Sequence, residues 1–254
     1  MPTLKIHLAS FFFCLALAAC SSPPRPLTVS AAANLQTAFT EIGAAFEKQN
    51  GTPVTLNYGA TGSLAQQIIQ GAPVDVFASA DVATVDDLAK RGFIITDTVQ
   101  IYARGQIVLY TRADNPIPLQ SLSDLANADV KRIAIANPET APYGHAARQA
   151  LQNSKLWDGL QAKIVIAENI QQTQQYADSG NVDAAITARS LAVGSKGKWT
   201  EIPQGLYTPI DQALGVVKGR PNESTARAFA AFVTGPAGRA VLVKYGYGLP
   251  AVNR

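Results

Sequence analysis

A glycine-rich turn between a predicted strand and a predicted helix is the feature that most constrains this chain. Residues 59–64 read Gly-Ala-Thr-Gly-Ser-Leu, after an alternating apolar and polar segment at 52–58 and before an amphipathic segment at 64–70. The first N–H groups of a helix have no partner within the helix, and they lie at the positive end of its dipole. With the hydroxyl groups of Thr61 and Ser63, they could bind an anion. The alternative is an ordinary helix cap, for which Thr and Ser are also preferred.

Strands and helices alternate along the rest of the chain. We expect strands at residues 27–30, 52–58, 74–78, 106–110, 132–136, 163–166, 182–187 and 210–217, and helices at 34–49, 64–70, 81–90, 121–126, 145–153, 170–178, 189–193, 223–234 and 237–244. Repeated β-α-β alternation predicts an α/β fold with mostly parallel, doubly wound sheets.

Ligands of such sheets bind where strands end and helices begin. Four junctions have this form, at residues 31–34, 59–63, 140–143 and 168–170. Two lie in the N-terminal half and two in the middle of the chain. A small solute held between two lobes would contact both pairs, which suits closure about a hinge.

The N-terminus has the pattern of an export signal. Lys5 precedes an apolar run at 8–19, which is too short to span a bilayer and is followed by Cys20. Residues 17–20, Leu-Ala-Ala-Cys, resemble the lipobox of bacterial lipoproteins. We therefore expect a signal peptide at 1–19, a lipid on Cys20 that attaches the protein to a membrane, and a tether at 20–26. The alternative is an ordinary secretory signal.

Composition excludes several classes of function. The hydrophobic content of 47% provides a packed core, and a net charge of +3 is too small to indicate nucleic-acid binding. The two cysteines are Cys14 and Cys20, so the exported protein would have no internal disulfide. One histidine after the signal argues against a transition-metal site.

Several stretches occur together, in an order typical of one family. They are LTVSAAANL at 27–35, YGATGSLAQQI at 58–68, GAPVDVFASAD at 71–81, ANPETAPYG at 136–144, GPA at 235–237 and YGYG at 245–248. Together they resemble the periplasmic molybdate-binding proteins of ABC importers. The resemblance covers nearly all of the chain after the signal.

The resemblance implies a bilobal periplasmic-binding-protein fold of type II, with two doubly wound lobes joined by two crossover segments. Lobe 1 would hold residues 27–103 and 213–254, and lobe 2 would hold residues 104–212. The implied function is to capture molybdate, and also tungstate, and to deliver it to the permease of an ABC importer. The protein would be a monomer with no cofactor and no enzymatic activity.

The resemblance also implies a set of ligand residues that are neutral donors, without arginine or a metal ion. They would be Asn34 with its neighbour Ala33, Thr61, Tyr143 and Ile170. Asn34 would donate its backbone and amide N–H groups, Thr61 its hydroxyl and backbone N–H, and Ile170 its backbone N–H. Tyr143 would donate its backbone N–H, and its hydroxyl if that group reaches the site.

The chain departs from the family pattern at two of these positions and at one other. Many members have serine at the positions of Asn34 and Thr61, and both replacements keep a donor. Many members also have a tyrosine where this chain has Ala188. The hydroxyl of Tyr143 is a candidate to replace the one that is missing there.

A site of donors alone selects oxyanions by their protonation state. Molybdate, tungstate and sulfate carry no proton at neutral pH, whereas hydrogen phosphate brings an O–H for which such a site has no acceptor. An unpaired buried donor costs about 1–3 kcal/mol. Only size would then separate sulfate from molybdate, so a binding protein for another oxyanion such as sulfate is the alternative.

An enzyme or a sensor module on the same fold is the other alternative. An enzyme would have to use His145, but the sequence has no Gly-x-Ser-x-Gly motif to accompany it. Asp75 and Asp81 could act as general acid and base. The simpler interpretation is that Asp75 ends a strand and Asp81 caps a helix.

Overall fold

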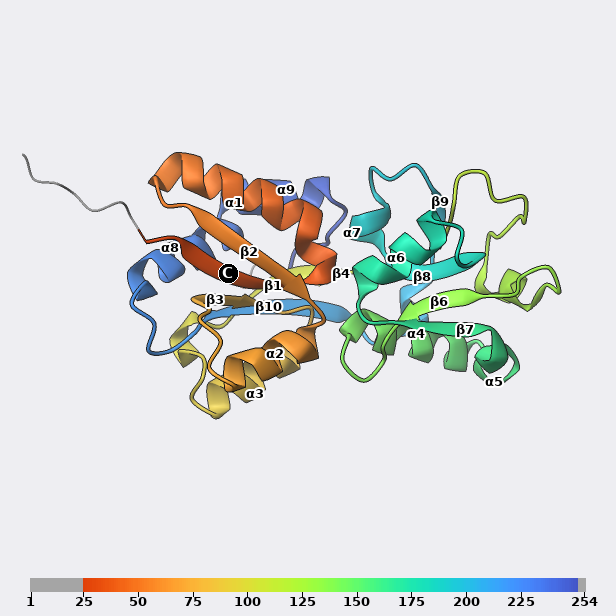
Figure 1. Ribbon diagram of the computed structural model, residues 1–254, viewed down its shortest axis with the longest axis horizontal. Coiled ribbons are helices and arrows are strands. Elements are labelled where there is room, and N and C mark those ends of the chain that lie inside the picture. The colour runs from red at the N-terminus through yellow and green to blue at the C-terminus, as the bar shows by residue number, and fades with distance from the viewer. Residues whose placement is uncertain (1–24, 251–254) are drawn as a thin grey trace, which may run out of the picture.

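The computed structural model describes residues 25–250. Two α/β lobes lie side by side along the long axis of the molecule (Figure 1), which confirms the predicted fold class. The predicted signal peptide at 1–19, the lipidation site Cys20 and most of the tether at 20–26 lie outside the described residues. Among residues 25–250, no helix is both long enough and apolar enough to cross a membrane.

The first lobe is built on a five-stranded sheet. Its order is β2 (Val54–Gly59), β1 (Leu27–Ala32), β3 (Val76–Ala78), β10 (Ile210–Val216) and β4 (Gln100–Gly105). One face packs against α1 (Gln36–Asn50), α8 (Glu223–Thr234) and α9 (Pro236–Lys244), and the other against α2 (Thr61–Ile69) and α3 (Val82–Lys90). A short 3-10 helix, η1 (Ala33–Leu35), leads into α1, and another, η2 (Thr96–Thr98), precedes β4.

The second lobe repeats this arrangement. Its sheet has the order β7 (Ile164–Ala167), β6 (Ile133–Ala136), β8 (Ala184–Ala188), β5 (Ile107–Thr111) and β9 (Lys198–Glu201). Helices α4 (Pro142–Asn153) and α5 (Trp157–Leu160) lie on one face, and α6 (Ile170–Asp178) and α7 (Arg189–Ala192) on the other. The remaining 3-10 helices are η3 (Leu122–Ala126), η4 (Gln161–Lys163) and η5 (Gln204–Leu206).

The helices form where the sequence pattern predicts a buried stripe. On α1 the stripe includes Phe39 and Phe46, which are completely or almost completely buried. Both rings meet Phe229 of α8 edge to face, with centroids 6.2 and 5.2 Å apart, a geometry that aromatic rings favour. The helix ends at Gly51, whose φ of 68° is a left-handed conformation suited to glycine.

The sheets are mixed rather than mostly parallel. Strand β10 runs antiparallel to β3 and β4, and β5 runs antiparallel to β8 and β9. Strands β4 and β9 were not predicted, because their exposed and buried positions do not alternate regularly. Residues 121–126, expected as an α-helix, contain the 3-10 helix η3.

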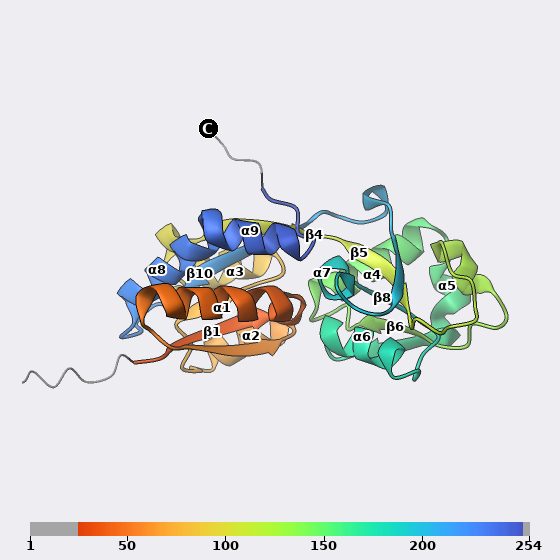
Figure 2. The ribbon, with the colours of Figure 1, turned by 90° about the horizontal axis from the view of Figure 1, so that it is seen from above.

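Two chain segments connect the lobes. Strand β4 leads directly into β5, and the return segment enters lobe 1 as β10 (Figure 2). The strands β4 and β10 pair with each other, and Arg104 forms a two-pronged ion pair with Asp211 across them, at 2.6 and 2.9 Å. Strand β4 extends to Gly105 and β10 begins at Ile210, so both run slightly past the expected boundaries at 103 and 213.

Candidate functional site

A small cavity lies between the lobes, where four helices begin. Its lining residues are Ala32, Ala33, Asn34, Gly59, Ala60, Thr61, Ala80, Ala141, Pro142, Tyr143, Asn169 and Ile170. Most of them come from the starts of η1, α2, α4 and α6 and from the residues just before these helices, and Ala80 comes from the turn between β3 and α3. All five ligand residues predicted from the sequence are among them. The cavity is small, with a volume of about 10 Å³.

The helix starts direct unpaired N–H groups at this cavity. In α2 and α4 the backbone bonds from Leu64 to Ala60 and from His145 to Ala141, both 3.0 Å, are the first of their helices. Thr61 and Tyr143 precede these donors, so their N–H groups have no intrahelical acceptor. In α6 the Asn169 side chain accepts from the second and third residues of the helix, which leaves the N–H of Ile170 as a donor.

The hydroxyl group of Thr61 is held in a donating orientation. Its Oγ1 accepts a hydrogen bond of 3.0 Å from the backbone N–H of Ala80. The lone pairs of the oxygen are thus directed at lobe 1, and its hydrogen remains free to bond to a ligand. Thr61 is 2% exposed, so the turn provides a side-chain donor as well as N–H groups at a buried position.

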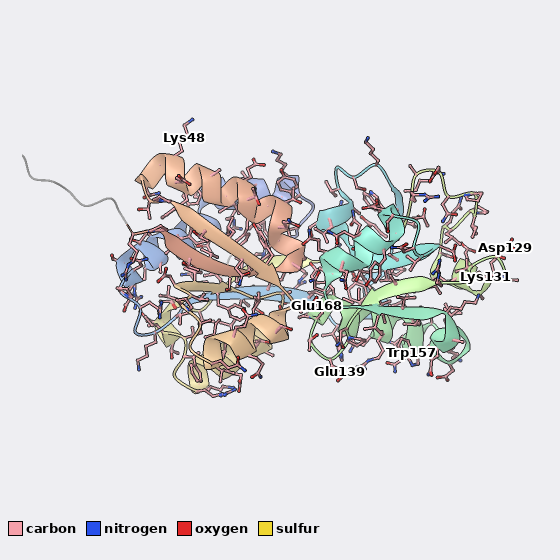
Figure 3. The ribbon with its side chains drawn as sticks, viewed as in Figure 1. Lys48, Asp129, Lys131, Glu139, Trp157 and Glu168 are labelled. Atoms are coloured by element: carbon pink, nitrogen blue, oxygen red, sulfur yellow. The ribbon has the colours of Figure 1, made fainter. Side chains whose placement is uncertain are left out.

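The cavity lining contains neutral residues only, within the part of the chain that the structure describes. Acidic side chains lie nearby but outside it. Figure 3 shows Glu168 at the junction of the lobes and Glu139 on lobe 2, and both residues are exposed. An anion in this cavity would therefore be held by hydrogen bonds and helix dipoles alone.

Asn34 contributes differently from what the sequence suggested. Its amide Nδ2 donates to Gln212 Oε1 and to the Tyr247 hydroxyl, both at 2.9 Å. Its backbone oxygen accepts from the hydroxyls of Tyr247 and Ser190, at 2.7 and 3.0 Å. Both amide hydrogens are consequently used within the protein, and the backbone N–H is the donor left for a ligand. Among residues 25–250, the Oδ1 atom has no hydrogen-bond partner.

The hydroxyl of Tyr143 acts as an acceptor within the protein. It accepts from Gln212 Nε2 at 2.9 Å and lies 3.4 Å from Asn34 Nδ2, whose two hydrogens point to the shorter contacts with Gln212 and Tyr247. Ala188 is buried at the end of β8 but does not line the cavity. That the hydroxyl of Tyr143 replaces a tyrosine at position 188 stays a prediction. The backbone N–H of Tyr143 is a second candidate donor at the site.

Gln212 is the important residue that sequence analysis missed. It is completely buried on β10, and a buried amide within a predicted strand is the signal that could have revealed it. Its Oε1 also accepts from the Tyr102 hydroxyl at 3.1 Å. Burial holds the pKa of the Tyr102, Tyr143 and Tyr247 hydroxyls above the ordinary tyrosine value. All three therefore stay protonated at neutral pH.

The lobes also contact each other directly beside the cavity. The N–H of Gly62 at the start of α2 donates to the carbonyl of Thr140 in lobe 2 at 2.9 Å. A Cβ atom on Gly62 would lie 3.1 Å from that carbonyl oxygen, closer than most such contacts. Arg189 of lobe 2 donates to the Gly246 carbonyl of lobe 1 at 2.9 Å. These contacts join the two lobes.

Asp75 and Asp81, which suggested an enzyme, accept hydrogen bonds from backbone N–H groups. Asp81 caps α3 by accepting from the Thr84 N–H at 2.7 Å, and Asp75 accepts from the Thr28 N–H at 2.8 Å. His145 lines a groove of about 530 Å³ that adjoins the cavity and shares Thr61, Ala141 and Pro142 with it. The His145 Nδ1 is 3.4 Å from Arg148 Nη2. No group of three potential metal ligands occurs within residues 25–250.

Comparison with known proteins agrees with this geometry. The family model for bacterial extracellular solute-binding proteins matches residues 27–248. The chain belongs to this family. It is 36% identical over 239 residues to the molybdate-binding protein of Azotobacter vinelandii, covering 92% of this chain and 94% of that protein. It is 33% identical over 218 residues to the molybdate-binding protein of Rhodobacter capsulatus, covering 85% of each.

This solute-binding protein also resembles solved structures and one further relative. The periplasmic molybdate-binding protein of A. vinelandii superposes with a TM-score of 0.84 at 32% identity, covering 88% of this chain and 99% of that one. A putative ABC transporter substrate-binding lipoprotein of Bacillus subtilis is 32% identical, covering 96% and 97%. A sulfate-binding protein of Mycobacterium tuberculosis shares the fold, with a TM-score of 0.75 at 16% identity. These relatives are transport proteins rather than enzymes.

The buried tyrosine cluster predicts how the stability of this solute-binding protein depends on pH. Because burial raises the pKa of Tyr102, Tyr143 and Tyr247, the folded state holds these protons more tightly than the unfolded state. Their contribution is complete below about pH 10, the ordinary tyrosine value, and is lost as the pH rises toward their folded pKa values. Urea unfolding between pH 8 and pH 11 would measure this, and Tyr143→Phe should make the decline less steep. An unchanged slope in the variant would contradict the assignment.

Proposed function

We propose that this protein captures molybdate between its lobes, also accepts tungstate, and delivers its ligand to the permease of an ABC importer. The observation that carries the proposal is the convergence of four helix starts on one small cavity lined only by neutral residues. The relatives described above that are named as molybdate-binding proteins support the same ligand.

The donors that we assign to the anion are five groups at the helix starts. They are the backbone N–H groups of Asn34, Thr61, Tyr143 and Ile170 and the hydroxyl of Thr61, with Ala33 beside Asn34 in the lining. A dianion that leaves water must regain nearly all of its hydrogen bonds. Hydrogen bonds to a charged group contribute about 1.5–3 kcal/mol each. Five such donors offset much of the loss of hydration without any buried cation.

Selectivity follows from the same donors and from the size of the cavity. A ligand oxygen that carries a proton would place a hydrogen against N–H and O–H groups, which disfavours hydrogen phosphate. Sulfate has the same charge as molybdate but is smaller, so it would not reach all four helix starts at once. Sulfate remains the alternative ligand, because the fold is shared with a sulfate-binding protein.

We also propose that the exported protein is a monomer held at a membrane by a lipid on Cys20. The lipobox-like residues 17–20 support this, and the similar B. subtilis protein is named as a lipoprotein. The anchor would keep the binding protein close to the permease, which raises its effective concentration there.

Thermal unfolding in the presence of different oxyanions tests the proposed ligand. The chain from Ser21, which includes every described element, is heated with molybdate, tungstate, sulfate or phosphate. A ligand at 1,000 times its dissociation constant adds about 4 kcal/mol to the free energy of unfolding. We expect a large rise in the melting temperature with molybdate and with tungstate, and none with sulfate or phosphate. A comparable shift with sulfate would replace this proposal with a general oxyanion site, and no shift with any anion would overturn it.

Replacing Thr61 with alanine tests the assignment of donors. Thr61→Ala removes a hydroxyl donor while the cavity keeps its backbone N–H groups, and the molybdate affinity should fall about tenfold or more. Isothermal titration calorimetry measures the change.

Thr98→Ala is the matched control for this substitution. Thr98 is a buried threonine of the same lobe, and its Oγ1 accepts from a backbone N–H, that of Val216, at 2.9 Å. It lies outside the cavity lining. The control should lose stability but bind molybdate normally. Equal affinities of Thr61→Ala and the wild type would place the anion elsewhere.

A further inference from the structure

Gln212 contacts the anion-site residues of both lobes without lining the cavity itself. Its Oε1 accepts from Asn34 Nδ2 in lobe 1 at 2.9 Å, and its Nε2 donates to the Tyr143 hydroxyl in lobe 2 at 2.9 Å. It lies on β10, the strand by which the chain returns to lobe 1. One completely buried amide thus joins a connecting strand to two residues whose backbones line the cavity.

The connecting strand β4 passes close to the contact between Gln212 and Tyr143, at Gly105. A Cβ atom on Gly105 would overlap the Tyr143 hydroxyl and lie 2.6 Å from Gln212 Nε2. The φ of Gly105 is not among the positive values in the chain, so the missing side chain serves the close approach rather than the backbone conformation. Both connections between the lobes therefore meet at the hydroxyl of Tyr143.

We propose that Gln212 is a positioning residue that couples anion capture to closure of the lobes. The inference rests on the proposed function. When the lobes are together, Gln212 Nε2 reaches the Tyr143 hydroxyl, and its Oε1 fixes the amide of Asn34. The contact between Gln212 Nε2 and the Tyr143 hydroxyl crosses from lobe 1 to lobe 2 and is lost when the lobes separate. It therefore stabilises the closed arrangement alone, and a contact specific to the binding-competent state raises the apparent affinity.

The network around Gln212 makes the amide hard to replace. The single hydroxyl hydrogen of Tyr102 is shared between the Ser79 carbonyl at 2.8 Å and Gln212 Oε1 at 3.1 Å. The Asn34 amide also donates to the Tyr247 hydroxyl. An apolar residue at 212 would leave the Asn34 amide and the Tyr143 hydroxyl without these partners inside the protein. Asn34 at the start of η1 and Tyr143 at the start of α4 would then no longer share a hydrogen-bond partner.

The primary test compares Gln212→Met, which keeps the length of the side chain, with Tyr143→Phe, which keeps the backbone N–H at the cavity. Both should raise the dissociation constant for molybdate about tenfold. Most of the change should be a faster dissociation rate in stopped-flow measurements. Small-angle scattering at saturating molybdate should show a larger radius of gyration than for the wild type.

Gln174→Met is the matched control. Gln174 is another buried glutamine, but its Nε2 donates to the Leu191 carbonyl within lobe 2, at 3.1 Å. The substitution should lower the melting temperature without changing the dissociation rate of molybdate. If Gln212→Met behaves in the same way, Gln212 has a structural role only and the inference is overturned.

Gly105→Ala provides a second variant that removes no hydrogen-bonding group. Its methyl group would push the Tyr143 hydroxyl away from Gln212 while leaving all lining residues intact. We expect the same faster dissociation of molybdate as in Tyr143→Phe. Wild-type kinetics in this variant would contradict the inference, because the structure leaves no space for both the methyl group and the contact.

A double-mutant cycle separates this inference from the proposed function. Gln212→Met, Tyr143→Phe and the combined variant are unfolded in urea without any ligand, and the free energies of unfolding should be non-additive because the two side chains touch. Additive losses would overturn the contact itself. If the wild type binds none of the four oxyanions, the proposed function fails, and the cycle still decides whether Gln212 joins the lobes.

Discussion

In the proposed function, the constraint on which this architecture depends is the burial of a doubly charged anion without a countercharge. Backbone N–H groups are neutral donors, and the first four of an α-helix have no partner within the helix. The protein brings four helix starts together, from α2, α4, α6 and the η1–α1 segment, and each comes after a sheet strand along the chain. The two-lobed fold is the means by which two sheets present their strand ends to the same point.

Much of this arrangement could be predicted from the sequence, because the signals are local. The alternation around residues 52–70 identified a strand, a turn and a helix, and the glycine turn between them identified Thr61 as a candidate donor. The buried stripe of α1, with Phe39 and Phe46, followed from its helical period. The positions of Ala33, Asn34, Tyr143 and Ile170 came from the family resemblance, and the structure brings all of them to one cavity.

What the sequence did not reveal depends on contacts between distant residues. Strands β4 and β9 are edge strands without regular alternation, and they follow from pairing rather than from their own composition. The orientation of the Asn34 amide is decided by Gln212 and Tyr247, which are 178 and 213 residues away in sequence. A side chain shared between two lobes has no local pattern, so Gln212 and the engaged hydroxyl of Tyr143 became apparent only in three dimensions.

The neutral lining of the cavity also bears on how a loaded protein differs from an empty one. The chain carries a formal charge of +3 at neutral pH, and the cavity lining holds no carboxylate, lysine, arginine or histidine within the described residues. Capture of a dianion would therefore release or take up no proton from the site. The whole ligand charge would be added to the complex and would lower its isoelectric point. A membrane partner could then distinguish the two forms by long-range electrostatics before any surface contact forms.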